Sequence, residues 1–332
     1  MKTILVTGGG GFIGSNLSVA LIERGTHNIV VCDVFGSSDK WRNLSKHPVS
    51  EIIAPEQMFE WLEVNRQQVE IVYHLGSMSS TVEKDIDLIL KYNFGLSVKL
   101  WRWCNARGVR LVYASAAATY GDGSKGFDDT IDLAYMRSLR PLSGYGWSKH
   151  LFDMHVAGAC ERGAGVCQLP QWVGLKFFNT YGPNEYHKED QRSVISKIAP
   201  QAIQGASVKL FRSYNPSYPD GGQKRDVMYV KDQVRVMLWL LDNPSVCGLF
   251  NLGTGRASTY NDMAKAIFAA IGRAPNIHYF DMPEDLAKNY QYITEANMKK
   301  LRAAGYTEPF TSLEAGVKDY VQNYLLKDDP YL

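Results

Sequence analysis

Short apolar runs alternate with helical patterns along the first half of the chain. Four runs of consecutive apolar residues predict buried strands at residues 3–7, 28–32, 69–74 and 109–115. Apolar positions at helical spacing predict helices over residues 12–24, 90–107 and 145–160. Strands that alternate with helices pair in parallel through crossover helices. The pattern therefore predicts an α/β fold with a Rossmann-type, doubly wound parallel sheet.

The second half of the chain is less regular. Its pattern predicts a strand at residues 173–178, helices at 193–204, 232–241 and 260–271, and short strands at 208–211 and 249–252. The tract 212–224 is rich in Asn, Pro, Ser, Gly and Asp, which is typical of a surface loop. We expect residues 1–170 to form the dinucleotide-binding domain, with later segments returning to it. Residues 171–332 should form mainly a smaller mixed α/β lobe that binds substrate.

Composition narrows the class of protein. The 332 residues are 45% hydrophobic, enough for a substantial core, and 36 basic against 34 acidic residues give a net charge of +2. This balance argues against nucleic acid as the main partner, because phosphate binding needs a concentrated basic surface. The five cysteines lack CxxC spacing, and no metal-ligand cluster is evident, so no metal site is predicted.

Nothing in the sequence predicts export or membrane insertion. The first apolar run stops at Thr7, too soon for a signal peptide, and no apolar stretch approaches the ~20 residues that span a membrane. Scattered cysteines also suit a reducing compartment. We therefore expect a cytoplasmic enzyme with no membrane partner.

A glycine-rich loop follows the first predicted strand directly and opens the first predicted helix. Gly8, Gly11 and Gly14 are spaced three residues apart in it. A tight strand-to-helix turn needs residues without Cβ, and a pyrophosphate needs bare backbone N–H groups at a helix N-terminus. Asp33 ends the second strand, where a carboxylate can accept hydrogen bonds from ribose hydroxyls. A purely structural glycine turn is the alternative, but the context favours a dinucleotide site.

The form of the dinucleotide depends on charges near Asp33. Asp33 alone favours NAD, because its charge would repel the 2′-phosphate of NADP. Lys40 and Arg42 follow closely and could pair with that phosphate, unless they belong to a solvated loop. Because two basic residues follow Asp33 so closely, we expect NADP, with NAD as the alternative.

Tyr145 and Lys149 form a YxxxK pair at the start of a predicted helix. Residues four apart lie on one helix face, and a lysine ammonium beside a phenol should lower the phenol's pKa from about 10. The phenolate could then take a proton from a sugar hydroxyl as hydride leaves the same carbon. An ordinary surface pair is the alternative reading.

Several motifs together resemble the extended short-chain dehydrogenase/reductase superfamily. They are TGGGGFIG (7–14), Asp33, YASAAATYG (113–121), YGWSK (145–149), FFNTYGP (177–183) and RDVMYVKD (225–232). Within the superfamily, the chain is most similar to the ADP-L-glycero-D-manno-heptose 6-epimerase family. The distinguishing stretches are YNFGLSVKLW (92–101), FFNTYGPNEYHK (177–188), VCGLFNLGTGRA (246–257) and LRAAGYTEPF (301–310).

The resemblance implies a reaction and a set of roles. Such enzymes invert C6 of ADP-D-glycero-D-manno-heptose by transient oxidation and re-reduction with bound NADP, as homo-oligomers in lipopolysaccharide biosynthesis. Tyr145, Lys149 and Lys188 would be catalytic, with Lys188 as the second acid/base. The implied cofactor contacts are Gly8, Gly11, Phe12, Ile13, Gly14, Asp33, Val34, Lys40, Leu75, Gly76, Ser77, Met78, Ser79, Asn93, Lys149, Thr180 and Lys188. The implied substrate contacts are Ser115, Asn179, Asp190, Lys197, Phe211, Arg212, Ser213, Tyr214, Arg225 and Tyr290.

The chain also departs from the superfamily pattern. Ala116 stands where relatives carry a Ser or Thr whose hydroxyl bonds the reacting oxygen, and Lys176 stands where an Arg is frequent. Ser115 is adjacent, but neighbours on a strand point to opposite faces. Two alternatives stay open: another sugar-nucleotide epimerase or dehydratase acting on a UDP- or GDP-sugar, or a catalytically impaired NAD(P)-binding variant.

Overall fold

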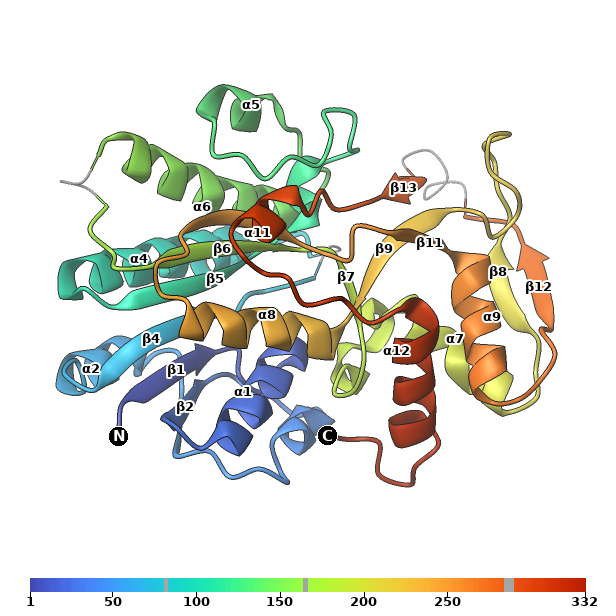
Figure 1. The fold of residues 1–332 in the computed structure, drawn as a ribbon, viewed down its shortest axis with the longest axis horizontal. Coiled ribbons are helices and arrows are strands. Elements are labelled where there is room, and N and C mark those ends of the chain that lie inside the picture. Colours follow the sequence, from blue (N-terminus) through green and yellow to red (C-terminus); the bar gives the residue numbers. More distant parts are fainter. Residues whose placement is uncertain (81–82, 164–166, 284–289) are drawn as a thin grey trace.

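A large parallel sheet dominates the molecule in the computed structural model, which describes residues 1–80, 83–163, 167–283 and 290–332. Its seven strands run in the order β10-β6-β5-β4-β1-β2-β3 (Figure 1). Their bounds are β1 Thr3–Thr7, β2 Asn28–Cys32, β3 Glu51–Ile53, β4 Val69–His74, β5 Arg110–Ala116, β6 Trp172–Phe177 and β10 Gly248–Leu252. The predicted Rossmann-type doubly wound sheet is confirmed.

Helices cover both faces of this sheet, which explains why its central strands are mainly apolar. Successive side chains of a strand point to opposite faces. In β1, Ile4 and Val6 pack in one core cluster with α1 (Phe12–Arg24) and α8 (Val230–Asp242). Leu5 packs in the opposite cluster with α2 (Met58–Val64), α4 (Leu96–Arg107) and α6 (Gly144–Glu161). Each fully buried aliphatic side chain contributes about 1.5–3 kcal/mol.

The predicted elements match the observed ones closely in the first half. The bounds of β1, α1, β2 and β4 are as predicted, and α6 extends the predicted helix by one residue at each end. The segment predicted as one helix over residues 90–107 starts with a π-helical turn, Leu90–Gly95, and continues as α4. β6, β10 and α8 lie beyond residue 170 yet complete the large sheet layer.

A second layer is built from small sheets and three helices. β7 (Asn179–Tyr181), β9 (Lys224–Tyr229), β11 (Ala257–Thr259) and β13 (Ile293–Thr294) form one sheet, and β8 (Val208–Phe211) pairs with β12 (Ile277–Phe280). The helices are α7 (Val194–Ile203), α9 (Tyr260–Ala270) and α12 (Leu313–Tyr320). Their apolar faces form a third core cluster, which Phe12 from the first turn of α1 joins. The glycine loop therefore borders this layer.

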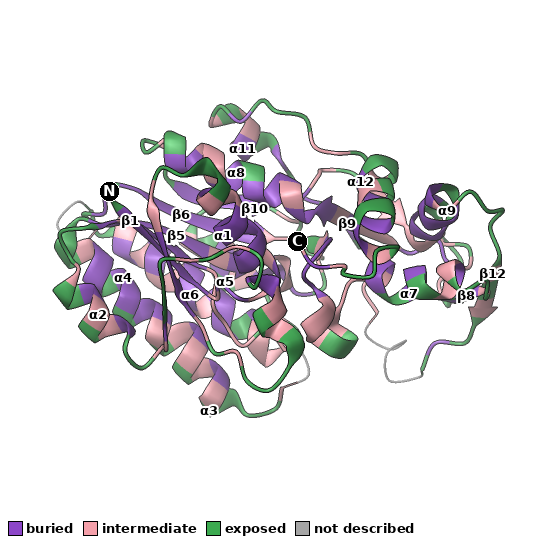
Figure 2. Ribbon diagram, turned by 90° about the horizontal axis from the view of Figure 1, so that it is seen from below, coloured by how far each residue is buried: buried purple, intermediate pink, exposed green. Residues whose placement is uncertain are grey.

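Short elements complete the described chain. They are α3 Ile86–Ile89, α5 Leu133–Ser138, α11 Lys299–Ala303, the 3₁₀ turns Asp39–Asn43 (η1), Ala117–Tyr120 (η3) and Tyr186–Gln191 (η4), and the π-helical turn Val321–Leu325. Buried residues concentrate in the strands and the inner helix faces, as the purple ribbon of Figure 2 shows. Among the described helices, none has the length and apolar character to cross a membrane.

The chain order places a topological switch beside β1. The connection after β1 leads to β2 on one side, and the connection after β3 leads to β4 on the other side. Loops leaving the carboxyl ends of β1 and β4 diverge there, which opens the crevice where doubly wound folds bind ligands.

Candidate active site

The glycine loop forms a cradle in which side chains would not fit. Gly8 has φ +67°, and a Cβ on it would lie 2.6 Å from the Cα of Gly76. A Cβ on Gly14 would collide with the Gly8 carbonyl oxygen. The N-cap of α1 is Gly11, and no side chain caps the helix. The first-turn N–H groups are therefore available to an anionic ligand, which fits the pyrophosphate of a dinucleotide.

Asp33 lies beside this cradle with its carboxylate already engaged. The N–H of Gly10 donates to Oδ2 at 2.8 Å, and the Lys40 ammonium donates to Oδ1 at 2.6 Å. The N–H of Val34 also donates to Oδ1, at 2.7 Å. Arg42 instead points to the C-terminal segment, where it lies over the Tyr331 ring. Lys40 is thus the basic group beside Asp33, and the predicted Arg42 pairing with a 2′-phosphate is not supported.

The predicted nicotinamide-side residues follow β4 and are tied to α6. Met78 donates its N–H to Asn93 Oδ1 at 2.8 Å, and the buried Asn93 amide lies 3.0 Å from Ser148 Oγ. The N–H of Gly76 donates to Thr7 Oγ1 at 3.1 Å. Leu75, Ser77 and Ser79 lie in the same segment, of which Ser79 is exposed. Asn93 therefore joins the end of β4 to the helix that carries Tyr145 and Lys149.

Tyr145 lies in the first turn of α6, which Ser143 caps by accepting from the N–H of Gly146 at 3.1 Å. Lys149 is buried one turn later, and its ammonium donates to the Ala114 carbonyl at 2.9 Å. Burial lowers the pKa of Lys149 to about 8. Burial raises the pKa of the Tyr145 phenol to about 12, and the Asp153 charge adds to the rise. The prediction that Lys149 lowers the phenol's pKa is therefore wrong in this structure, where burial outweighs it.

A buried charged cluster, Asp153 and Lys176, lies near Tyr145 and Lys149. Asp153 accepts from the Lys176 ammonium at 2.8 Å and from the Ser115 hydroxyl at 2.6 Å, and Lys176 also donates to Thr119 Oγ1 at 2.6 Å. Ser115 is only 2% exposed, so the structure does not support its predicted substrate role. Ala116 follows it at the end of β5. Lys176 is thus an internal ion-pair partner rather than a nucleotide contact.

Lys188 approaches the cradle from a different element. It lies in η4, with its ammonium 5.4 Å from the centre of the Phe12 ring at the start of α1. Burial lowers its pKa, the Glu185 charge opposes this, and the Lys197 charge adds to the lowering. Asn184 and Glu189 on either side have φ of +73° and +48°, which non-glycine residues rarely adopt. Backbone in sparsely populated conformations beside a lysine with a lowered pKa is typical of a functional loop.

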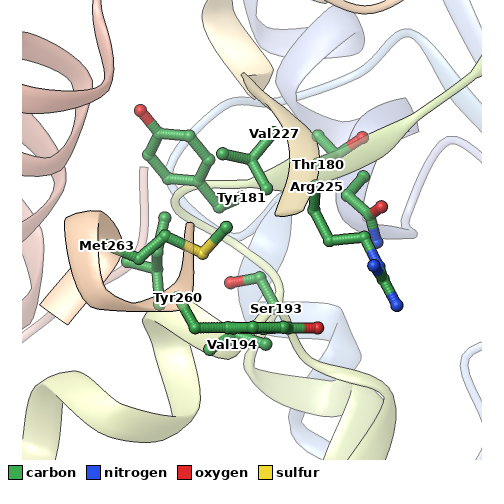
Figure 3. A pocket seen from close by; sticks show the side chains of 10 residues that line it. Thr180, Tyr181, Ser193, Val194, Arg225, Val227, Tyr260 and Met263 are labelled. Atoms are coloured by element: carbon green, nitrogen blue, oxygen red, sulfur yellow. The ribbon is translucent and has the colours of Figure 1, made fainter. Parts of the chain in front are cut away.

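A small pocket with a mixed polar and apolar lining lies between β7, β9, α7 and α9 (Figure 3). Its lining includes Asn179 of β7 and Arg225 of β9, which were predicted as substrate contacts, and Thr180 of β7, which was predicted as a cofactor contact. The Arg225 guanidinium lies 5.2 Å from the Tyr290 ring and 5.9 Å from the Tyr260 ring, and the two tyrosine hydroxyls are 3.1 Å apart. Sequence reasoning missed Tyr260, which looked like an ordinary helix start. The structure brings Asn179, Arg225 and Tyr290 to one region.

The other predicted substrate residues are placed as follows. Phe211 ends β8 against Phe280, at 4.8 Å between ring centres. Arg212, Tyr214, Asp190 and Lys197 are exposed, and Ser213 is half-buried. The N–H of Tyr214 donates to the Tyr292 hydroxyl at 3.1 Å, and Tyr292 packs edge-on against Tyr290. The 211–214 segment thus adjoins the Arg225 region, whereas Asp190 and Lys197 both follow Lys188 in the chain. Within the described part of the chain, no group of three His, Cys, Asp or Glu side chains is placed to hold a metal.

A doubly wound sheet with a glycine cradle at its first helix, a buried Tyr/Lys pair, and a second layer that holds a pocket with Arg225 defines a nicotinamide-dependent enzyme of the extended short-chain type. The family model described as "NAD dependent epimerase/dehydratase family" matches residues 4–253. The chain belongs to this family.

The names of individual relatives are more specific than the description of the family. An ADP-L-glycero-D-manno-heptose-6-epimerase of Nitratidesulfovibrio vulgaris (strain DP4) is 48% identical over 330 residues, covering 99% of each chain. The enzyme of that name from Fusobacterium nucleatum is 42% identical and covers 99% of this chain and 100% of its own. Among solved structures, the Helicobacter pylori ADP-L-glycero-D-manno-heptose-6-epimerase superposes with a TM-score of 0.77 at 26% identity, covering 97% of this chain and 96% of that one.

Proposed function

We propose that the chain is an epimerase that inverts C6 of ADP-D-glycero-D-manno-heptose by transient oxidation and re-reduction. The likeness to two full-length relatives of that name supports the substrate. One structural observation carries the chemistry: two candidate acid/base groups come from separate elements, Tyr145 from the first turn of α6 and Lys188 from η4. The Lys188 ammonium lies 5.4 Å from the centre of the Phe12 ring at the start of α1. A redox inversion needs a proton acceptor and donor for each epimer. An oxidoreductase with one stereochemical outcome would need only the tyrosine.

The cofactor is a nicotinamide dinucleotide, and we infer that it is NADP. The Lys40 ammonium, 2.6 Å from Asp33, cancels the carboxylate charge that would repel a 2′-phosphate. Lys40 also keeps donor capacity, since an ammonium has three N–H groups. The mass of the nucleotide released on denaturing the purified protein tests this. A mass of NAD would contradict it.

Each residue has a defined task in this proposal. A bound nicotinamide would supply the hydride acceptor for C6 and would return the hydride to the same carbon. Tyr145 takes the C6 hydroxyl proton of one epimer, and Lys188 takes that of the other. The pKa of the phenol is raised before ligands bind. Its deprotonation would therefore depend on the Lys149 ammonium and on the positive charge of an oxidised nicotinamide ring. Lys188 is suited to a base because its lowered pKa raises the neutral fraction.

Binding is divided between the two layers. We propose that Arg225 and Tyr290 contact the diphosphate and sugar, with Asn179 beside the reacting end. Thr180, whose hydroxyl accepts from Gln233 at 2.7 Å, would lie against the cofactor. Arginine suits a diphosphate because its planar fork donates several hydrogen bonds at once.

The deciding experiment is NMR of C6 inversion with ADP-heptose. We expect wild type to invert C6 and Lys188→Ala to lose at least about a hundredfold in turnover while cofactor stays bound, as for removal of a general base. Lys265→Ala, which removes an exposed lysine of α9, is the control for loss of a positive charge. Full turnover in Lys188→Ala would remove its catalytic role. Absence of inversion in wild type, with activity on a UDP-sugar, would replace the proposed substrate.

A further inference from the structure

The C-terminal residues 329–332, here called the strap, lie against the loop that follows β2. The Lys46 ammonium donates to the Tyr331 carbonyl at 2.8 Å and pairs with Asp329 at 3.0 Å. The Arg42 guanidinium lies 4.4 Å from the centre of the Tyr331 ring and 3.5 Å from Asp329. Figure 1 shows the red C-terminal segment turning back from α12 toward the blue N-terminal elements. This loop also carries Lys40, beside the cofactor carboxylate.

The other side of the strap holds η4, the element that carries Lys188. The Tyr186 hydroxyl donates to the Pro330 carbonyl at 2.9 Å, and its ring packs edge-on against Tyr331 at 5.1 Å. The N–H of Leu332 donates to Asn184 Oδ1 at 3.0 Å. The Tyr331 side chain is almost fully buried between these groups, at 7% exposed. Two loops that are far apart in sequence are therefore joined through the strap.

The side chain of Asn43, in η1, joins the same two loops to the glycine loop. Its buried amide nitrogen lies 2.9 Å from the Gly10 carbonyl, 3.2 Å from the Asn184 carbonyl and 3.2 Å from His187 Nδ1. Asn184 in turn donates to Ser15 Oγ of α1 at 3.0 Å. The glycine loop, η1 and η4 thus share one hydrogen-bond network, and the strap packs against it.

This hydrogen-bond network explains how η4 can keep a strained backbone conformation. η4 has no fully buried residue of its own and contains Glu189 at φ +48°. Residues in sparsely populated regions cost of the order of 1–3 kcal/mol each and persist only where neighbours hold them. The described contacts at the start of η4 come from Asn43, from the strap, and from the buried Glu185 carboxylate, which accepts from the N–H groups of Gly182 and Ser193.

We propose that the strap is a positioning device for Lys188: it fixes η4 against the cofactor loop, so that the ammonium stays over the cradle. Tyr331 is its central residue, through its ring and its backbone carbonyl. The proposal rests on the proposed function, in which Lys188 serves one of the two epimers. Tyr145 lies on α6, which the strap does not touch, so the strap acts on one half of the reaction.

The test compares the full-length enzyme with Tyr331→Ala and with a deletion of residues 329–332. Tyr331→Phe keeps the aromatic ring, which Tyr331→Ala removes, and is the conservative variant that should retain activity. Asp328→Ala, just outside the strap and without a polar partner among the described residues, is the matched control. Three readouts are taken: C6 inversion by NMR, reduction of bound cofactor on rapid mixing with each separate epimer, and amide hydrogen exchange over residues 185–192.

We expect inversion to fall at least about tenfold in Tyr331→Ala and in the deletion, and to stay within about twofold of wild type in both controls. Cofactor reduction should slow with one epimer and persist with the other, while exchange over residues 185–192 accelerates. Wild-type inversion in Tyr331→Ala would overturn the proposal. Equal loss with both epimers together with loss of cofactor would also overturn it, because the strap would then be merely structural.

Failure of the proposed function has a different signature. Wild type itself would then show no inversion and no cofactor reduction with either ADP-heptose epimer. Hydrogen exchange still judges the strap in that case: unchanged exchange over residues 185–192 in Tyr331→Ala would refute it, and faster exchange confined to that segment would support it. Should the deletion variant fail to fold, the Tyr331→Ala and Tyr331→Phe pair decides.

Discussion

Gly14 shows how one atom can decide cofactor binding. Any Cβ at this position meets the Gly8 carbonyl and lies 2.8–2.9 Å from further backbone of the glycine loop, so the loop itself must move. We expect Gly14→Ala to retain at least about tenfold less nicotinamide dinucleotide after purification, since a shifted loop mispositions the N–H groups that face the pyrophosphate.

The measurement is cofactor content by absorbance and by mass after denaturation. Gly158→Ala in α6 is the matched control, because a Cβ there meets only the flexible end of Arg162 at 3.6 Å. That substitution should leave binding unchanged and stabilise the helix by up to about 1 kcal/mol. Equal cofactor content in both variants would mean that the cradle is not where the phosphates bind.

Ala116 is the residue at which the chain departs from its superfamily. It ends β5, two residues beyond the carbonyl that anchors Lys149, and it carries no hydroxyl. We expect Ala116→Ser to raise turnover, by up to about tenfold for one added hydrogen bond to the reacting oxygen. Steady-state inversion rates test this, with Ala117→Ser as the control. An unchanged rate would show that other groups already compensate.

At the scale of elements, the first turn of α6 links helix stability to catalysis. Ser143 accepts from the N–H of Gly146 and holds the turn that contains Tyr145. Ser143→Ala should lower the free energy of unfolding by about 1 kcal/mol and reduce turnover, because the turn frays where the phenol is placed. Ser143→Asp keeps an acceptor and should preserve both.

Urea denaturation and turnover measured on the same samples check this link. A loss of stability without a loss of turnover would separate the cap from the placement of Tyr145. The comparison has meaning because Ser148 and Lys149 anchor the next turn independently, through Asn93 and the Ala114 carbonyl.

At the scale of the whole molecule, we expect the large-sheet layer to bind the cofactor and the small-sheet layer to bind the substrate. The cradle belongs to the large sheet, whereas Arg225 belongs to β9 of the small sheet. We expect Arg225→Ala to raise KM for the ADP-sugar at least about tenfold with cofactor content unchanged, the reverse of the result for Gly14→Ala. A tenfold change corresponds to about 1.4 kcal/mol of binding. Exposed Arg256→Ala is the control, and a parallel loss of cofactor in Arg225→Ala would contradict the division.

The apolar pattern by itself determined the large sheet. Strands buried on both faces are mainly apolar. Residues 3–7, 28–32 and 69–74 therefore stand out in the sequence, as do the glycines that a strand-to-helix turn requires. β3, β7, β11 and β13 gave no such signal, because they have two or three residues each and are partly exposed.

Tertiary structure decided what local pattern cannot carry. It placed β6 and β10 in the large sheet, paired Lys40 with Asp33, turned Ser115 away from the site and joined Tyr260 to Arg225. It also raised the pKa of the Tyr145 phenol, where the spacing of the motif predicted a lowered one. Burial and charge at a side chain depend on groups hundreds of residues away, as with Tyr331 beside Lys46, and only the folded chain brings them together.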